Sequence, residues 1–191
     1  MTNNIAIFAS GSGSNAQRIV EYFMGNRQIN ISVILTNNKS AYVIERAKQL
    51  NLPYIVISKL ELDQNEIMLK VLKERNIKWI VLAGFLLKIP EFLIKAFPNN
   101  IINIHPALLP KYGGKGMYGD NVHKSVIMNK ESESGITIHF VNELYDDGEI
   151  IFQAEVKIEA DETPETLAKK IHELEYKYFP EVIEKVIESR E

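Results

Sequence analysis

Cysteine is absent from the sequence, tryptophan occurs once, and neither sign of charge dominates. Without cysteine the chain forms no disulfide, binds no metal through thiolates and has no cysteine nucleophile. The 22 lysines and arginines against 25 aspartates and glutamates give a net charge of −3, whereas a nucleic-acid-binding surface carries a clear excess of basic residues. The composition therefore argues against a nucleic-acid partner and is that of an ordinary globular protein.

Long apolar runs are also missing. The longest covers residues 79–87, with a lysine on each side, and is about half as long as a membrane-spanning helix. The N-terminus has no basic segment and only a short apolar stretch at 5–9, so it does not look like a secretion signal. The sequence predicts a cytoplasmic protein with no membrane partner, and it leaves open whether the protein is a monomer or a homodimer.

Short apolar runs alternate with helical patterns over the first hundred residues, as in βα units. Helices are expected at 15–23 and 40–50, and a third after Asp63, which resembles an N-cap with Glu66 three residues later. That helix would bury Ile67, Val71 and Leu72. Uniformly apolar strands separated by helices favour a parallel sheet covered on both faces, and the strands are expected at 5–9, 31–36, 54–57, 79–83 and 101–104.

The last third of the chain has a different pattern. Two strand-like runs, 135–141 and 150–158, are separated by only eight residues and are expected to pair antiparallel at the edge of the sheet. Thr163 and Pro164 predict the start of a closing helix, whose apolar face would consist of Leu167, Ile171, Leu174, Tyr178 and Val182. The expected fold is thus a single α/β domain, with a mostly parallel twisted sheet, helices on both faces and antiparallel strands near the C-terminal end.

The first candidate site is the run GSGSN at residues 11–15, between the first strand and the first helix. Glycines permit a tight turn there, and the free N–H groups at a helix start favour an anion such as phosphate. The spacing matches neither a dinucleotide-binding fingerprint nor a Walker loop. A tight turn with a capped helix accounts for the run equally well.

The second candidate is the pair Asn103 and His105 at the end of the fifth strand. Residues two apart on a strand point to the same side, and Pro106 then forces the chain out of the sheet. An amide donor beside an imidazole suits an oxyanion and a proton transfer. This pairing favours a catalytic role over a histidine that simply ends a strand.

The third candidate is Asp146, in the loop between the last two strands. Its carboxylate could face His105 and fix the orientation of that ring. The run Asp-Asp-Gly at 146–148 is also a strong turn signal, and the residues alone favour the turn.

The remaining motifs are weaker. Residues 110–120 hold four of the ten glycines and predict either a mobile flap over a site or a plain surface loop. His123 on the next helix belongs either to that site or to the solvated surface, and His139 is interpreted as structural. The four histidines are scattered without metal-ligand spacing, so no metal is expected.

Five motifs occur in order along the chain: GSGSN at 11–15, LAGF at 82–85, IINIHPALLP at 101–110, GITIHFV at 135–141, and Asp146-x-Gly148. Together they resemble the folate-dependent phosphoribosylglycinamide formyltransferases of purine synthesis, and the resemblance covers essentially the whole chain. It implies transfer of the formyl group of 10-formyltetrahydrofolate to the amine of 5′-phosphoribosylglycinamide, directly and through a tetrahedral intermediate, with no metal. The resemblance also implies a phosphate-binding, Rossmann-like half at 1–100 and a catalytic and folate-binding half at 101–191.

The same resemblance assigns roles to individual residues. The catalytic group would be Asn103, His105 and Asp146. The ribonucleotide would be bound by Gly13, Ser14, Asn15 and Glu175. The folate donor would be bound by Leu86, Leu87, Lys88, Ile89 and Asn103.

Two departures from the family pattern concern the donor side. Glu61 stands where the family often has an arginine, and residues 86–89 read LLKI rather than the commoner MRIL. Two relatives with the same catalytic trio carry an additional domain, at the C-terminus in methionyl-tRNA formyltransferase and at the N-terminus in formyltetrahydrofolate hydrolase. The length of this chain argues against both. The hydrolase and a non-catalytic phosphate-binding module remain the alternatives.

Overall fold

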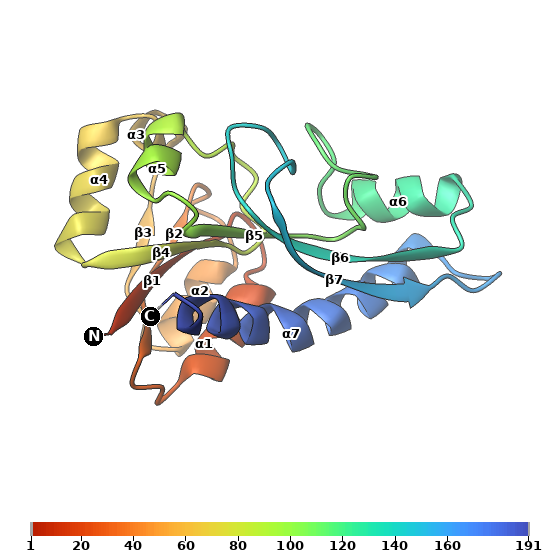
Figure 1. Ribbon diagram of the computed structural model, residues 1–191, viewed down its shortest axis with the longest axis horizontal. Helices are drawn as coiled ribbons and strands as arrows, with labels where there is room; N and C mark the ends of the chain where they lie inside the picture. Colours follow the sequence, from red (N-terminus) through yellow and green to blue (C-terminus); the bar gives the residue numbers. More distant parts are fainter. Residues whose placement is uncertain (1, 191) are drawn as a thin grey trace.

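The computed structural model describes residues 2–190 and contains one seven-stranded sheet in the order β3-β2-β1-β4-β5-β6-β7 (Figure 1). The strands are β1 (Asn3–Phe8), β2 (Ile29–Thr36), β3 (Tyr54–Val56), β4 (Ile77–Leu82), β5 (Ile101–His105), β6 (Glu133–Phe140) and β7 (Ile150–Lys157). The helices are α1 (Ser14–Phe23), α2 (Val43–Gln49), α3 (Lys59–Leu62), α4 (Asn65–Glu74), α5 (Glu91–Ala96), α6 (Asp120–Met128) and α7 (Pro164–Glu188).

The sheet confirms the predicted α/β class. Strands β1 to β5 are parallel, with β1 between β2 and β4, and β6 and β7 pair antiparallel beside β5. The parallel strands are apolar on both sides because both sides are covered. Helices α1 and α7 pack on one face, with Ile19 and Ile183 in the core, and α4 and α5 pack on the other, with Leu72 and Leu93 (Figure 1).

The prediction of a helix capped by Asp63 is wrong. Ser58 caps α3 instead, in a reciprocal capping box with Glu61, and Asp63 ends that short helix. Both Ser58 and Asp63 are followed three residues later by a glutamate, so the local signal occurs twice and the earlier cap is the one used. Helix α4 then starts at Asn65 and leaves Ile67 exposed, and it buries Met68 and Leu72 rather than the predicted set of Ile67, Val71 and Leu72.

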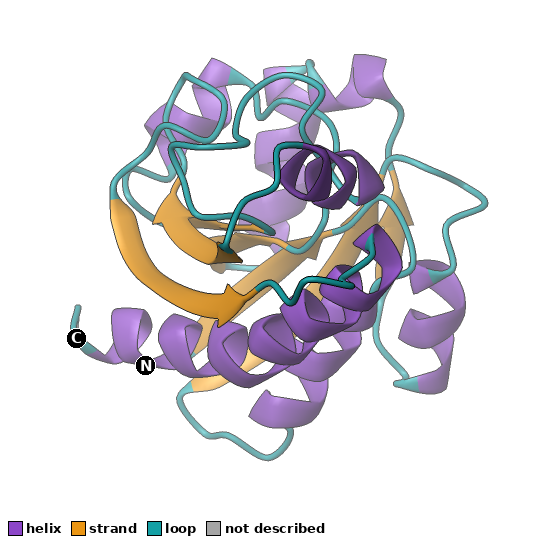
Figure 2. Ribbon diagram, turned by 90° about the vertical axis from the view of Figure 1, so that its right-hand side faces the viewer, coloured by secondary structure: helices purple, strands orange, loops and turns teal. Residues whose placement is uncertain are grey.

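The closing helix α7 begins where predicted, because Thr163 forms a capping box with Thr166 and Pro164 takes the first turn. It lies along one face of the sheet and ends beside the C-terminus (Figure 2). Leu174 and Tyr178, predicted as core, are only partly buried, whereas Glu175 and Phe179 are buried. Glu175 is buried because it lines the cavity described below and is hydrogen-bonded there.

Two further differences from the expected elements are small. The second helix starts at Val43 rather than at residue 40, and α5 had no counterpart in the sequence analysis. Within residues 2–190, no helix combines the length and the apolar character that a membrane crossing needs.

Candidate active site

A cavity of about 640 Å³ lies at the carboxyl ends of β1, β4 and β5, where ligands bind in open α/β sheets. The predicted motifs line it together, although they come from distant parts of the sequence. The lining includes segments 11–15, 82–89, 103–106 and 114–119, with His139, Asp146 and Glu175. Thus all three candidate sites, and both halves of the chain, contribute to one cavity.

Asn103 is held in the cavity by His139, a residue that the sequence analysis took as structural. The two face each other in the antiparallel register of β5 and β6, with Asn103 Nδ2 3.0 Å from His139 Nε2. His139 Nδ1 lies 2.8 Å from the backbone oxygen of Phe140, which can only accept, so Nδ1 carries the proton. Burial lowers the pKa of His139, and the neutral ring therefore accepts the Asn103 amide proton at Nε2.

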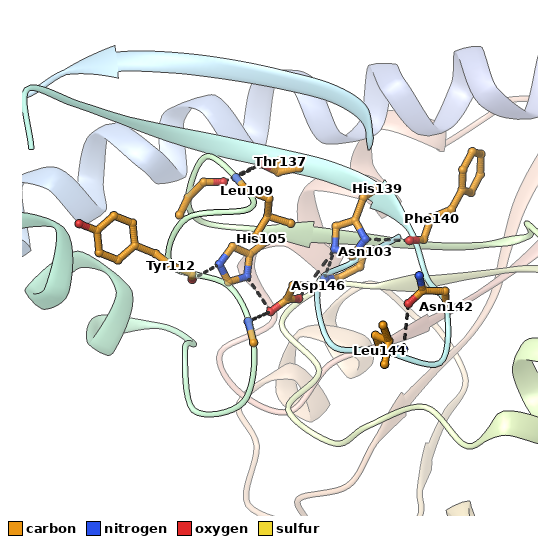
Figure 3. A network of polar contacts seen from close by, with 12 residues as sticks. Asn103, His105, Leu109, Tyr112, Thr137, His139, Phe140, Asn142, Leu144 and Asp146 are labelled. Carbon is orange, nitrogen blue, oxygen red and sulfur yellow. Dashed lines mark hydrogen bonds and ion pairs between the residues drawn. The ribbon is translucent and has the colours of Figure 1, made fainter. Parts of the chain in front are cut away.

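His105 ends β5 with both ring nitrogens facing polar groups, and it is 4% exposed (Figure 3). Nε2 lies 2.7 Å from the backbone oxygen of Tyr112, and Nδ1 lies 3.6 Å from Asp146 Oδ2. The same Asp146 oxygen accepts a hydrogen bond of 2.8 Å from the Gly114 N–H. Asp146 Oδ1 lies 3.8 Å from His139 Nε2, so one carboxylate faces both histidines.

Asp146 fulfils both interpretations that the sequence allowed. It lies in the turn between β6 and β7 with a φ of 52°, and that turn carries its carboxylate to His105. Gly148 lets the turn pack closely against β6, because a Cβ at that position would be 1.7 Å from the Phe140 backbone oxygen. The turn signal and the functional carboxylate are therefore the same feature.

The glycine-rich run forms another end of the cavity. Gly13 precedes α1 with a φ of 72°, and a Cβ there would be 2.3 Å from Val43 Cγ2, so only glycine fits. The helix starts at Ser14 with no side-chain cap within residues 2–190, and the backbone N–H groups of its first turn face this end, as an anion site requires. This geometry supports the phosphate interpretation of residues 11–15.

Glu175 joins this end of the cavity from α7. It is 5% exposed, accepts a hydrogen bond of 2.9 Å from Asn15 Nδ2, and lies 2.8 Å from His172 Nδ1. The hydrogen bond and the charge of Glu175 raise the pKa of His172. These contacts explain why α7 buries the carboxylate of Glu175, whereas its neighbour Leu174, which was expected to be buried, is only partly so.

His123 is buried beside the same cavity rather than solvated. It is 3% exposed, and burial lowers its pKa. Within residues 2–190, its Nδ1 and the Oδ1 of Asn15 are buried atoms without a hydrogen-bond partner. Both residues line the cavity, so these two polar atoms can meet a ligand bound there.

Residues 86–89 line a third part of the cavity, between β4 and α5. The backbone of Leu86 is fixed by a 2.9 Å hydrogen bond from its N–H to Ser10 Oγ, while half of Leu86 is exposed to the cavity side. Lys88 Nζ lies 5.6 Å from the centre of the Tyr145 ring. The apolar side chains and the nearby backbone form a wall suited to a flat ring system.

The sequence analysis missed three parts of the site, namely His139, His172 and the Tyr112 backbone oxygen. His139 could have been found by pairing β6 with β5 in register, because it stands directly opposite Asn103. His172 is one helical turn before Glu175 on the same face, which is a detectable spacing. Nothing local marks the backbone oxygen of Tyr112.

Comparisons with known proteins agree on one family. A family model described as formyl transferase matches residues 3–183. The chloroplastic phosphoribosylglycinamide formyltransferase of Arabidopsis thaliana is 40% identical over 97% of this chain, and this chain spans 66% of that protein. The phosphoribosylglycinamide formyltransferase of Bacillus subtilis is 33% identical over 95% of this chain and 93% of its own length.

Solved structures are similar over nearly the whole chain. The phosphoribosylglycinamide formyltransferase of Bacillus halodurans superposes with a TM-score of 0.88 at 32% identity, covering 99% of this chain and 97% of its own. Glycinamide ribonucleotide transformylase 1 of Geobacillus kaustophilus gives 0.87 at 34% identity, covering 97% and 99%. This chain spans less than two thirds of both plant relatives, 66% of the Arabidopsis protein and 61% of the one from Vigna unguiculata.

Proposed function

Because this chain belongs to the formyl transferase family, we propose that it transfers the formyl group of 10-formyltetrahydrofolate to the amine of 5′-phosphoribosylglycinamide. The products are N-formylglycinamide ribonucleotide and tetrahydrofolate, a step of purine synthesis. The family implies a folate-type formyl donor and small-molecule substrates. One observation carries the proposal: Asn103, His105 and Asp146 share a cavity with a helix start that suits phosphate.

The ribonucleotide end of the cavity comprises residues 13–15 and Glu175. The backbone N–H groups at the start of α1 would bind the phosphate, with Ser14 as an added donor. Glu175, already bonded to Asn15 and His172, would accept from the ribose hydroxyls. The Asn15 and His123 atoms that lack a partner within residues 2–190 would supply further contacts for the same ligand.

The donor end comprises residues 86–89 and Asn103. Leu86, Leu87 and Ile89 would pack against the pterin ring while neighbouring backbone groups meet its polar edge. The LLKI sequence of this wall, like Glu61, departs from the commoner family pattern. The LLKI sequence bears on the affinity for the donor rather than on the chemistry, whereas Glu61 caps α3 and is not among the described residues that line the cavity.

The transfer end comprises Asn103, His105 and Asp146. When the substrate amine attacks the formyl carbon, the formyl oxygen gains negative charge, and the second N–H of the Asn103 amide would donate to it. Protonated His105 adds a positive charge beside that oxygen. Asp146 stabilises the charged ring and helps to relay the amine proton to the departing nitrogen of tetrahydrofolate, which balances the reaction.

Two alternatives predict different substrate requirements. A formyltetrahydrofolate hydrolase would use water in place of the amine, and a phosphate-binding module would use residues 11–15 without chemistry. The compartment stays a prediction, because the name of the Arabidopsis relative gives the chloroplast, whereas that of the Bacillus subtilis relative gives none.

Steady-state conversion of 10-formyltetrahydrofolate, measured with and without 5′-phosphoribosylglycinamide, tests the proposal. We expect conversion only when the ribonucleotide is present, with one N-formyl product formed per donor consumed. Equal conversion in water alone would identify a hydrolase. Absence of conversion in both cases, together with ribonucleotide binding, would identify the binding module.

A further inference from the structure

We propose that Tyr112 is a positioning residue of the transfer end: its phenol, bonded to Glu131 and Asn129, holds its own backbone oxygen against His105 and so fixes which ring nitrogen of His105 exchanges a proton. The catalytic meaning of this inference rests on the proposed function. The state of the ring does not, since it follows from contacts within the protein alone.

The contact between His105 and Tyr112 fixes the tautomer of the ring. Nε2 lies 2.7 Å from the Tyr112 backbone oxygen, and a carbonyl oxygen can only accept a hydrogen bond. Nε2 must therefore keep its proton whether the ring is neutral or charged. Nδ1, which faces Asp146 Oδ2 at 3.6 Å, is left as the nitrogen that gains and loses a proton. That is the nitrogen from which a relay through Asp146 can work.

Tyr112 presents its backbone oxygen in an unusual conformation. Its φ of 56° lies in the left-handed region, which residues other than glycine adopt rarely. Two hydrogen bonds of the phenol hydroxyl stabilise this conformation: it donates to Glu131 Oε1 at 2.8 Å and accepts from Asn129 Nδ2 at 3.0 Å. We call these three side chains the tether. The tether joins Tyr112, which precedes α6, to Asn129 and Glu131, which follow that helix.

The residues that follow Tyr112 hold the other member of the pair. The Gly114 N–H donates to Asp146 Oδ2, and a Cβ on Gly113 would be 3.2 Å from the Cβ of Asp146. Residues 112–114 thus contact both His105 and Asp146 and set their separation. The cavity-lining segment, 114–119, lies beyond the tether. The tether can therefore hold His105 and Asp146 in place independently of the conformation of segment 114–119.

The ionisable groups that face His105 come from three elements. They are Asp146 in the loop after β6, His139 on β6 and His123 on α6. None of them belongs to the tether. Changes in the tether therefore act on the geometry of His105 and leave the charges around it in place.

The decisive variant is Tyr112→Phe, which keeps the ring and removes the two hydrogen bonds of the hydroxyl. Lys111→Ala is the matched control, because Lys111 pairs with Glu131 at 3.2 Å but does not touch the phenol. Nitrogen NMR of ¹⁵N-histidine-labelled protein without substrates would report the His105 tautomer. Turnover would be measured with both substrates over the pH range from about 5.5 to 9.

We expect wild type and Lys111→Ala to show only the Nε2–H tautomer of His105, and Tyr112→Phe to show a mixture. Turnover of Tyr112→Phe should fall on the order of tenfold with both KM values within about twofold, because misplacement of a reacting group lowers kcat rather than binding. The pH profile of kcat should change shape in Tyr112→Phe and keep its shape in Lys111→Ala.

A Glu131 pair keeps the test decisive if Tyr112→Phe does not fold. Glu131→Ala should reproduce the mixed tautomer, and Glu131→Gln, whose amide oxygen still accepts from the phenol, should restore the single one. A folded variant without the tether that retains the wild-type tautomer and kcat profile would overturn the inference. A wild-type protein with the single tautomer but no formyl transfer would instead refute the proposed function.

Discussion

The transfer end and the ribonucleotide end of the cavity are built in different ways. At the transfer end, Asn103, His105 and Asp146 already contact protein groups, through His139, Tyr112 and Gly114. At the ribonucleotide end, the Oδ1 of Asn15 and the Nδ1 of His123 are buried without partners within residues 2–190. The transfer end is therefore held in position by protein contacts before any ligand arrives, and the ribonucleotide end carries unmet hydrogen-bonding capacity.

This difference predicts that the transfer end stabilises the transition state and that the ribonucleotide end contributes to ligand binding. Groups held in position by their neighbours need no reorganisation when charge develops, which favours the transition state. Buried polar atoms without partners cost free energy, which a ligand recovers when it binds. Changes at the transfer end should thus lower kcat, and changes at the ribonucleotide end should raise one KM.

The largest effect is expected at Asn103. In Asn103→Ala the amide that would stabilise the formyl oxygen is lost, and turnover should fall on the order of 10²–10³-fold, as for other oxyanion donors. The KM for the ribonucleotide should change by less than about threefold, because the proposed contacts with its phosphate and ribose lie at the ribonucleotide end. Steady-state kinetics with each substrate varied in turn would measure both values.

Thermal unfolding of the same variant separates chemistry from folding. A melting temperature close to that of the wild type would assign the loss of turnover to the missing amide. Turnover near the wild-type value in folded Asn103→Ala protein would remove this residue from the mechanism, and with it the central part of the transfer end.

A smaller effect of the opposite kind is expected at Glu175. Glu175→Gln keeps an oxygen that can accept from Asn15 but loses the charge that pairs with His172. We expect the KM for the ribonucleotide to rise by about tenfold, roughly the loss of one charged hydrogen bond, while kcat changes little. Kinetics at saturating donor would measure the change.

Glu173→Gln provides the matched control for this prediction. It removes the same charge two residues away on α7, from a side chain exposed to solvent. Its kinetic constants should equal those of the wild type. An equal rise in KM in both variants would mean that the net charge of the helix, rather than contact by Glu175, controls ribonucleotide binding.

Local rules predicted the parts of the site that lie on one strand or one turn. Asn103 and His105 were placed together by the two-residue period of a strand, and the position of residues 11–15 followed from the order of strand and helix. The sheet class followed from uniformly apolar runs. Each of these inferences needs only neighbours within a few residues.

The parts that depend on distant partners could not be predicted in this way. The role of His139 comes from its register with Asn103, 36 residues earlier, and the burial of Glu175 comes from Asn15, 160 residues away. The role of Asp146 depends on two features together, the turn that it occupies and the position of His105, 41 residues earlier in the chain. The error at Asp63 was local, because two equivalent capping signals compete within a few residues.

The smallest expected effect is a pH dependence of stability with opposite sign for two histidines, His139 and His172. Burial lowers the pKa of His139, so the unfolded chain takes up a proton that the folded protein resists, and stability falls as the pH drops below about 6.5. The bond to Glu175 raises the pKa of His172, so its contribution is complete below about 6.5 and is lost as the pH rises through the raised value.

Free energies of unfolding from urea titrations between about pH 5 and 8.5 would resolve the two contributions. His139→Gln should flatten the acid side only in part, because burial also lowers the pKa of His123. His172→Gln should flatten the slope of the free energy of unfolding above about pH 6.5. The contribution lost should be less than about 1 kcal/mol, because His172 is half exposed and screened by solvent. Flattening on the same side in both variants would contradict opposite pKa shifts of His139 and His172.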